Sequence, residues 1–233
     1  MSFKKRFWSD VTIEESRDGF EIALDGRHVK TPAKSSLALP NRALAELVAG
    51  EWRAQETDVQ PETMPATRMG NSVIDKVHHN HAAIVDMLAD YGGTDLVCYR
   101  ATGPYELIAR QASAWDPILA WVQDTYGPLN ITEGVMHIDQ PKTTLKNLKL
   151  PVAALNPWQL AGFHDLVTIS GSLVLALAVG SNHLETEAAW NASRVDEIWQ
   201  IDQWGADEQA EANAGHKRDA FLFAEKFYRL ASD

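Results

Sequence analysis

Residues 19–30, GFEIALDGRHVK, read as two strands joined by a tight turn. The part 20–24 alternates Phe, Ile and Leu with Glu and Ala, which is the period of a half-buried strand. Asp25 and Gly26 follow directly, and this pair favours a hairpin turn because glycine adopts positive φ without steric cost. Residues 27–30 are then the returning strand, so the chain is expected to begin with β structure.

Working outward, strand-like patterns recur at 11–13 and 37–39, and Pro40 ends this part of the chain. Beyond it, apolar residues recur at steps of three and four, the period of an amphipathic helix. Helices are expected at about 40–52, 69–88, 105–125, 157–168, 170–180, 185–203 and 207–230. Strands followed by helices indicate an α+β protein, with a small β-rich domain over 1–40 and a larger, mainly α-helical domain over 41–233.

Prolines mark the segments that are expected to be irregular. Residues 57–67 hold two prolines and show no period, which is typical of a loop. Residues 127–157 hold four, and two interpretations stay open there: a short strand at 135–138, or a join between two helical layers. Pro117 lies inside the helical pattern of 105–125 and is expected to kink or divide that helix.

The composition limits the partners and the setting. The net charge is −11, so no basic patch for phosphates is expected, which argues against nucleic acid and anionic membranes as partners. The most apolar run, 166–179, is too short to span a bilayer and is expected to be a buried helix. Cys98 is the only cysteine, which excludes an internal disulfide and a multi-cysteine metal site. We expect a cytoplasmic protein without a cofactor and without membrane insertion.

One histidine cluster admits a catalytic interpretation. His78, His79 and His81 lie within one predicted helix. A metal ion needs three or four ligands that converge on one point, whereas these side chains diverge around the helix. A solvated polar face is the favoured interpretation, and a metal-dependent enzyme of unknown type is the alternative.

The paired carboxylates and the cysteine are weaker candidates for catalytic residues. Asp196 and Glu197 are adjacent, as are Asp207 and Glu208, and either pair is a formal candidate for acid–base work. Neighbouring side chains on a helix point about 100° apart, so neither pair shares a target by itself. Cys98 lies in an apolar run, where a buried, inert thiol is favoured over a nucleophile.

Tryptophan and negative charge concentrate in residues 184–210, LETEAAWNASRVDEIWQIDQWGADEQA. If this region is one continuous helix, the ring of Trp199 lies about 180° from that of Trp190, so at least one ring points away from the core. Five side chains recur at steps of four, three, four and three and so form one stripe of that helix: Trp190, Arg194, Glu197, Ile201 and Trp204.

Two uses of this stripe stay open, namely burial in the core and contact with a partner. Tryptophan beside arginine and glutamate is the usual composition of an interface hot spot. Residues 181–233 carry eleven acidic and five basic side chains, a net charge of −6. Such a surface would attract a basic partner and set its orientation.

The chain also resembles a known family through motifs spread over most of its length. The motifs are RFW at 6–8, LDGRxxKTPA at 24–33, LAxxxAxEW at 44–52, MPATRMGNSVID at 64–75, YGGTDLVCYRA at 91–101, QASAWDPILAW at 111–121 and SRVDEIWQIDQWG at 193–205. With them the chain resembles the assembly chaperones for the alpha subunit of the F-type ATP synthase catalytic head, the mitochondrial ATP synthase assembly factor 2-like family. LDGRxxKTPA and WQxxxWG, in this order, are the specific part of the resemblance.

The resemblance implies a β-rich N-terminal domain, a helical C-terminal domain and no enzymatic activity. It implies that a monomer binds the free alpha subunit and shields the surface that the beta subunit later occupies. It places the functional acidic residue at Glu197, with Asp196 as a near alternative. The relatives first described are mitochondrial, in the matrix. Because the start, MSFKKRFWSD, is no arginine- and serine-rich leader, a bacterial member or a mature form is expected.

Overall fold

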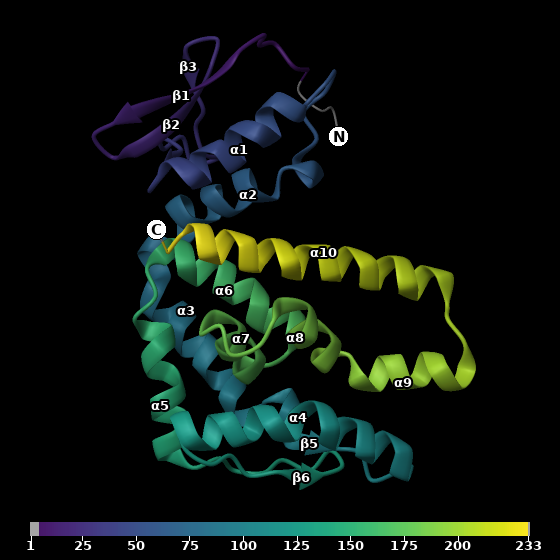
Figure 1. Ribbon diagram of the computed structural model, residues 1–233. Coiled ribbons are helices and arrows are strands. Elements are labelled where there is room, and N and C mark those ends of the chain that lie inside the picture. The colour runs from purple at the N-terminus through teal and green to yellow at the C-terminus, as the bar shows by residue number, and fades with distance from the viewer. Residues whose placement is uncertain (1–4, 233) are drawn as a thin grey trace. The chain divides into compact units, whose positions relative to one another are not determined.

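The computed structural model describes residues 5–232 and contains two compact units (Figure 1). The first comprises the described residues up to 81 together with 156–162 and 226–232, and the second comprises 82–155 and 163–225. Strands gather near the N-terminus and helices form most of the rest, so the predicted α+β class is confirmed. The domain boundary at residue 40 stays a prediction, and residues 1–4 and 233 of the two predicted domains lie outside the described part.

The first unit opens with a small antiparallel sheet. Strands β1 (Val11–Ser16), β2 (Gly19–Leu24) and β3 (Arg27–His28) lie in that order, and β4 (Ala38–Leu39) also pairs with β2. The Asp25-Gly26 turn is confirmed: both residues have positive φ, of 46° and 77°. The strand expected at 27–30 is shorter than predicted and ends at 28.

Helix α1 (Arg42–Ala54) packs against this sheet with its apolar face, including Leu44 and Val48. Near its end, Glu51 accepts hydrogen bonds from the backbone N–H groups of Ala66 and Thr67, at 2.6 and 2.8 Å, and so caps the next helix. Burial is the main cause that raises the pKa of this carboxyl.

The next helix begins earlier than predicted. α2 (Pro65–Ser72) starts inside the segment 57–67 that was expected to be a loop, and a 3₁₀ turn, η1 (Pro61–Thr63), precedes it. Proline is suited to the first turn of a helix, and the cap comes from α1 in a distant part of the sequence. A helical segment of π type, η2 (Val73–Val77), then leads into α3 (His78–Asp90).

Asp75 in η2 connects the motif MPATRMGNSVID, to which it belongs, with the motif LDGRxxKTPA. Its carboxylate accepts hydrogen bonds from the Thr31 hydroxyl at 2.7 Å and from the Ala33 backbone N–H at 3.1 Å. The two motifs therefore meet in a structural contact inside the first unit.

The second unit is mainly helical. After the 3₁₀ turns η3 (Tyr91–Thr94) and η4 (Leu96–Cys98), the elements are β5 (Tyr99–Arg100), α4 (Tyr105–Thr125), β6 (Thr132–Glu133), α5 (Lys142–Ala153), α6 (Pro157–Ser170), α7 (Leu173–Gly180), α8 (Thr186–Ser193), α9 (Val195–Trp204) and α10 (Glu208–Leu230). Residues 157–162 of α6 and 226–230 of α10 belong to the first unit, and residues 82–90 of α3 belong to the second. The apolar run 166–179, expected to be a buried helix, is divided between the end of α6 and α7, and residues 173–179 of α7 are all buried. Within residues 5–232, no helix is both long enough and apolar enough to cross a bilayer.

Two predictions for the proline-rich segments were wrong. Residues 127–157 contain helix α5, and the strand there is at 132–133 rather than at 135–138. The helical pattern of Leu148 and Val152, both buried, was hidden among the prolines. Pro117 does not divide α4, which continues from Tyr105 to Thr125, and a kink at this proline stays a prediction.

A buried carboxylate organises the centre of the second unit. Asp95 is fully buried and accepts hydrogen bonds from the Ser172 hydroxyl at 2.6 Å and from the Val174 N–H at 3.0 Å, at the start of α7. It also accepts from the Val97 N–H at 3.3 Å, at the start of η4. Burial raises the pKa of Asp95 to about 6, and these hydrogen bonds oppose that shift.

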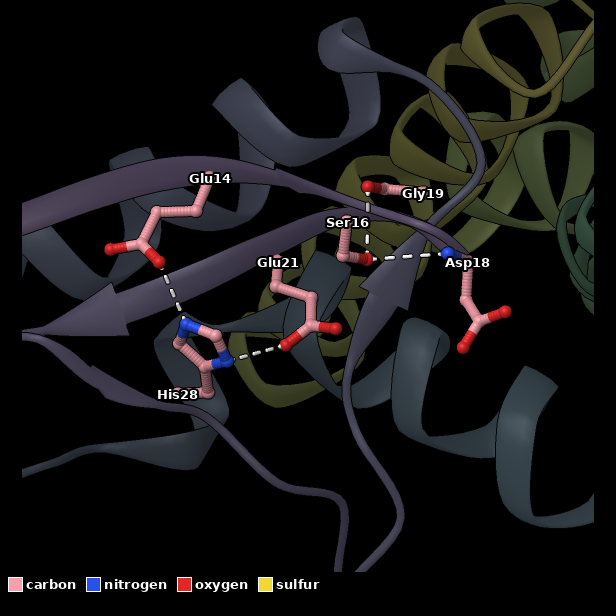
Figure 2. A network of polar contacts seen from close by, with 6 residues as sticks. All are labelled: Glu14, Ser16, Asp18, Gly19, Glu21 and His28. Carbon is pink, nitrogen blue, oxygen red and sulfur yellow. Dashed lines mark hydrogen bonds and ion pairs between the residues drawn. The ribbon is translucent and has the colours of Figure 1, made fainter.

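A second network ties three strands together in the first unit (Figure 2). Glu14 and Glu21 are directly opposite each other on β1 and β2, which places like charges side by side. The ring of His28 on β3 lies between them, with Nε2 2.8 Å from Glu14 and Nδ1 2.7 Å from Glu21. A protonated imidazole relieves the repulsion, and hydrogen bonding to Glu14 is the main cause that raises the pKa of His28. At the hairpin end, the Ser16 hydroxyl donates to the Gly19 carbonyl.

Replacing Asp95 is expected to destabilise the protein and to change its response to pH. Asp95→Ala should lower the free energy of unfolding by about 3 kcal/mol, because buried donors lose their acceptor. The folded carboxyl has the higher pKa, so the folded state binds more protons between pH 3.8 and about 6, and wild-type stability should fall as pH rises through that window. Asp95→Asn should lose less stability than Asp95→Ala and should abolish this slope. Urea unfolding at several pH values measures the free energy of unfolding and its slope with pH. Equal slopes in wild type and Asp95→Asn would contradict the raised pKa of Asp95.

The His28 network is expected to stabilise the sheet most at acidic pH. The folded pKa lies above the ordinary value of 6.5, so the stabilisation is fully present below that value and is lost as pH rises through the raised pKa. NMR titration of the His28 ring should show the raised pKa, and His28→Gln should flatten the pH dependence of unfolding above pH 6.5. An unshifted titration of the His28 ring would refute the role of this network.

Candidate functional site

The tryptophan segment is two helices, so the predicted single helix over 185–203 is wrong. Helix α8 ends at Ser193, and α9 begins at Val195, with Arg194 between them at φ −122° and ψ 19°. The indole N–H of Trp115 donates to the Ala192 carbonyl at 2.7 Å, and so occupies the acceptor that a continuing helix would offer to residue 196. The break comes from a residue far away in sequence, which the local pattern does not reveal.

The break changes the meaning of the predicted stripe. Its five residues do not lie along one helix, and the predicted 180° relation between Trp190 and Trp199 does not hold. Trp190 is buried and packs against Phe221, with ring centroids 5.9 Å apart. The Arg194 guanidinium lies over the Trp190 ring, 5.2 Å from its centroid. Trp190 is therefore a support beneath Arg194 rather than an exposed ring.

Helix α9 is held on α4 by two polar contacts. The Gln111 side-chain amide donates to Asp196 at 2.6 Å, and the Arg110 guanidinium pairs with Asp202 at 2.6 Å. Asp196, one of the predicted contact residues, is therefore turned toward α4. None of the ten residues of α9 is buried, so the helix is attached without contributing a buried side chain to the core.

The side of α9 away from α4 carries the other predicted residues. At 100° per residue, Glu197, Ile201 and Trp204 lie opposite the side that holds Asp196 and Asp202. Glu197 is exposed, and Arg194 is 3.9 Å from its carboxylate. Ile201 is partly exposed, and Trp204 is 75% exposed. We call Glu197, Ile201 and Trp204 the outer face of α9.

The outer face combines apolar area with one carboxylate, that of Glu197, whereas Asp196 and Asp202 lie on the side that faces α4. The Trp204 ring packs edge-on against Trp199, at a centroid distance of 5.7 Å, which gives the exposed indole a defined position. Residues 195–216 contain six acidic side chains and no lysine or arginine. An apolar centre with a charged rim is the usual arrangement of a protein–protein interface.

A pocket of about 420 Å³ adjoins the start of the outer face. Trp115 and Trp190 line it, together with Arg194 and Glu197, and Lys217 of α10 contributes from the other side. The pocket is open and mixed in charge, so it suits a protruding part of a partner chain better than a small apolar ligand.

The alternative sites show no catalytic arrangement. His78 packs edge-on against Trp158, with centroids 6.4 Å apart, and burial lowers its pKa. Among residues 5–232 no three histidine, cysteine, aspartate or glutamate side chains are grouped so as to hold a metal ion. The neighbours Asp196 and Glu197 point to different partners. Cys98 is buried, as the favoured interpretation predicted, and burial raises its pKa to about 12.

Comparison with known proteins places the chain among chaperones. The sequence model of the family described as ATP12 chaperone protein matches residues 5–123, which ends before α9. Among solved structures, the chain is similar to Atp12 from Paracoccus denitrificans, with 42% identity, 98% of each chain covered and a TM-score of 0.93. It is also similar to the Atu1473 protein from Agrobacterium tumefaciens, with 37% identity, 97% of this chain and 85% of that chain covered and a TM-score of 0.92. Mitochondrial atp12 of Schizosaccharomyces pombe is 25% identical over 219 residues, or 88% of this chain and 75% of that protein.

Removing the polar attachment of α9 is expected to loosen that helix while the rest of the fold persists. In the double variant Asp196→Ala/Asp202→Ala, amide hydrogen exchange in residues 195–204 should accelerate, because both contacts to α4 are lost. Unfolding of the whole protein should change by about 1 kcal/mol or less, since the Arg110 pair is exposed. Asp124→Ala, which removes an exposed carboxylate elsewhere on α4, is the control. Unchanged exchange in the double variant would mean that side-chain packing alone holds α9.

Proposed function

Because the chain belongs to the ATP12 chaperone protein family, we propose that it binds the free alpha subunit of the F-type ATP synthase catalytic head during assembly. The motif resemblance described above names this partner, and the similarity to Atp12 of P. denitrificans over almost the whole chain supports the same assignment. The chaperone shields the interface of the alpha subunit until the beta subunit docks.

The observation that carries the proposal is the exposed, acidic and aromatic outer face of α9. Single exposed apolar side chains are common at protein surfaces, so the weight lies on a large aromatic ring that shares one side of a helix with further apolar and charged groups. Trp204 is such a side chain, with Ile201 and Glu197 on the same side of the helix. We assign these three residues to partner contact, with Asp196, Trp190 and Arg194 as the residues that position them.

The chemistry of a free ring subunit fits this surface. A subunit that is buried in a ring exposes apolar area before assembly, and such area drives aggregation. Ile201 and Trp204 cover part of it, while the carboxylates around them orient a partner with basic residues and speed its association. The apolar centre is small, so affinity stays moderate and release remains fast.

Release then needs no chemical step. The beta subunit forms the larger interface and displaces the chaperone, so neither nucleotide hydrolysis nor any other enzymatic activity is part of the proposal. The protein acts as a monomer without a cofactor, in the cytoplasm of a bacterium.

Charge reversal on the outer face is expected to abolish capture of the alpha subunit. Glu197→Lys should weaken binding of purified alpha subunit at least about tenfold, because it places like charge against a basic partner. Trp204→Ala should weaken binding by a similar factor through loss of the exposed ring. Calorimetry measures the affinities, and circular dichroism should show both variants folded.

The matched control is Asp124→Lys, the same type of charge change on an exposed residue of α4. It should bind like wild type, with the same protection of the alpha subunit from aggregation in light scattering. If Glu197→Lys and Trp204→Ala also bind like wild type, the outer face is not the contact surface. If wild type does not bind purified alpha subunit at all, the partner is wrong.

A further inference from the structure

Trp204 is the one tryptophan of this chain whose ring is open to solvent. The other seven tryptophans are buried or partly exposed, whereas Trp204 is 75% exposed. Its ring meets the ring of Trp199 at a centroid distance of 5.7 Å, with 87° between the two planes. A single edge-on neighbour covers at most one face of an indole, so at least one face of the Trp204 ring is free for a partner.

Elsewhere the chain covers indole rings with its own arginines. The guanidinium carbon lies 5.2 to 5.6 Å from the ring centroid in these pairs: Arg6 over Trp8, Arg100 over Trp115 and Arg194 over Trp190. Within residues 5–232, no cation covers Trp204 in this way, and the stretch 195–216 has no lysine or arginine. The open face of Trp204 is therefore a cation-attracting surface that the described chain does not fill.

Carboxylates follow this ring directly along the chain. Residues 205–207 connect α9 to α10 (Figure 1), and Asp207 and Glu208 come three and four residues after Trp204. Four residues span at most about 14 Å, so both carboxylates are near the ring. Both are exposed, and neither has an ion-pair partner in the part of the chain that the structure describes. An open ring face and unneutralised negative charge thus occur together.

We propose that one arginine side chain of the partner lies on the open face of the Trp204 ring and donates hydrogen bonds to the carboxylates of residues 207–208. The inference rests on the proposed function, in that the partner is the alpha subunit. It adds the chemical group that this ring recognises, while Ile201 keeps the apolar contact.

An arginine satisfies both features of this site at once. The face of an indole carries partial negative charge and attracts a cation. A planar guanidinium stacks on the ring and keeps the N–H donors at its edge free for a carboxylate. An apolar side chain on the ring would leave the nearby carboxylates desolvated without a partner, and a lysine ammonium is a strongly hydrated point charge that does not stack.

Fluorinated tryptophan at position 204 tests the contact with the ring face. Fluorine withdraws electron density from the face of an indole and weakens its attraction for a cation, whereas the shape and apolar character of the ring change little. The affinity for purified alpha subunit, measured by calorimetry, should fall stepwise as one to four fluorines are placed on the indole, by about tenfold with four. A purely apolar contact would keep or gain affinity, and that result would overturn the proposal.

The matched control is the same fluorine series at Trp121, a partly exposed ring on α4. This ring is stacked on His183, with centroids 4.6 Å apart, and is not part of the proposed site. Fluorines at 121 should change the affinity for alpha subunit less than about twofold. An equal loss of affinity in both series would overturn the proposal, because the loss would then be a general effect of the analogues.

Neutral variants test the carboxylates. Asp207 accepts a hydrogen bond from the Ala210 N–H at 2.8 Å and so caps α10, a role that asparagine retains. Asp207→Asn/Glu208→Gln should therefore keep the fold and weaken binding of alpha subunit about fivefold. Asp124→Asn on α4 should bind like wild type. Wild-type affinity in the double variant would overturn the two-part site.

Chemical footprinting identifies the cation. Phenylglyoxal modifies arginine and acetic anhydride modifies lysine, and mass spectrometry locates the modified residues of alpha subunit. In the complex with the wild-type chain, one arginine of alpha subunit should be protected. In the complex with Trp204→Leu, formed at saturating concentration, the same arginine should be modified faster. If a lysine shows this dependence on Trp204, or if no arginine does, the proposal is overturned.

The two proposals fail in different ways. Binding that is indifferent to fluorine at 204 would retain the partner and the outer face of α9, and would remove the arginine contact. Absence of binding by the wild-type chain would remove the proposed function itself.

Discussion

One hydrogen bond, from the indole of Trp115 to the carbonyl of Ala192, separates the buried part of the tryptophan segment from its exposed part. It lies at the break between α8 and α9, where Arg194 departs from helical geometry. With it, α8 keeps Trp190 in the core against Phe221, and α9 starts in a new direction and lies against α4. The candidate site therefore depends on a buried residue that does not contact the partner.

Other helix boundaries in the chain also involve a side chain from another element. Glu51 of α1 caps the start of α2, and Asp95 caps the start of α7 from nearly eighty residues away. Unpaired N–H groups at helix starts are costly when buried, so a carboxylate from another element stabilises each start. Such caps fix where helices begin, and they place charged groups inside units whose excess charge is otherwise at the surface.

The sequence predicted elements whose signals are local. The Asp25-Gly26 turn, the alternating strand before it and the apolar run of α7 all appear where their own residues indicate them. Two features at which side chains from other elements make contacts were missed, the start of α2 and the break at Arg194, and the helix at 142–153 was missed because prolines obscure its pattern. For the candidate site, composition pointed to the segment that we propose as the contact surface, but it could not show that Trp190 lies beneath the surface while Trp204 lies on it. Nor could spacing alone show that Asp196 is engaged with Gln111.

The function that we propose for α9 accounts for the way in which this helix is attached. A binding helix packed into the core would be rigid and could carry large apolar side chains, but those side chains would not be available to a partner. A helix without a fully buried side chain, tied to α4 by a hydrogen bond and an ion pair, keeps apolar residues at the surface and can adjust as a partner docks. Its acidic side chains can orient a partner at long range, which a small apolar surface cannot do. Polar attachment on one side and exposed aromatic area on the other are therefore two consequences of one requirement, which is to hold an unassembled subunit without competing with its final interface.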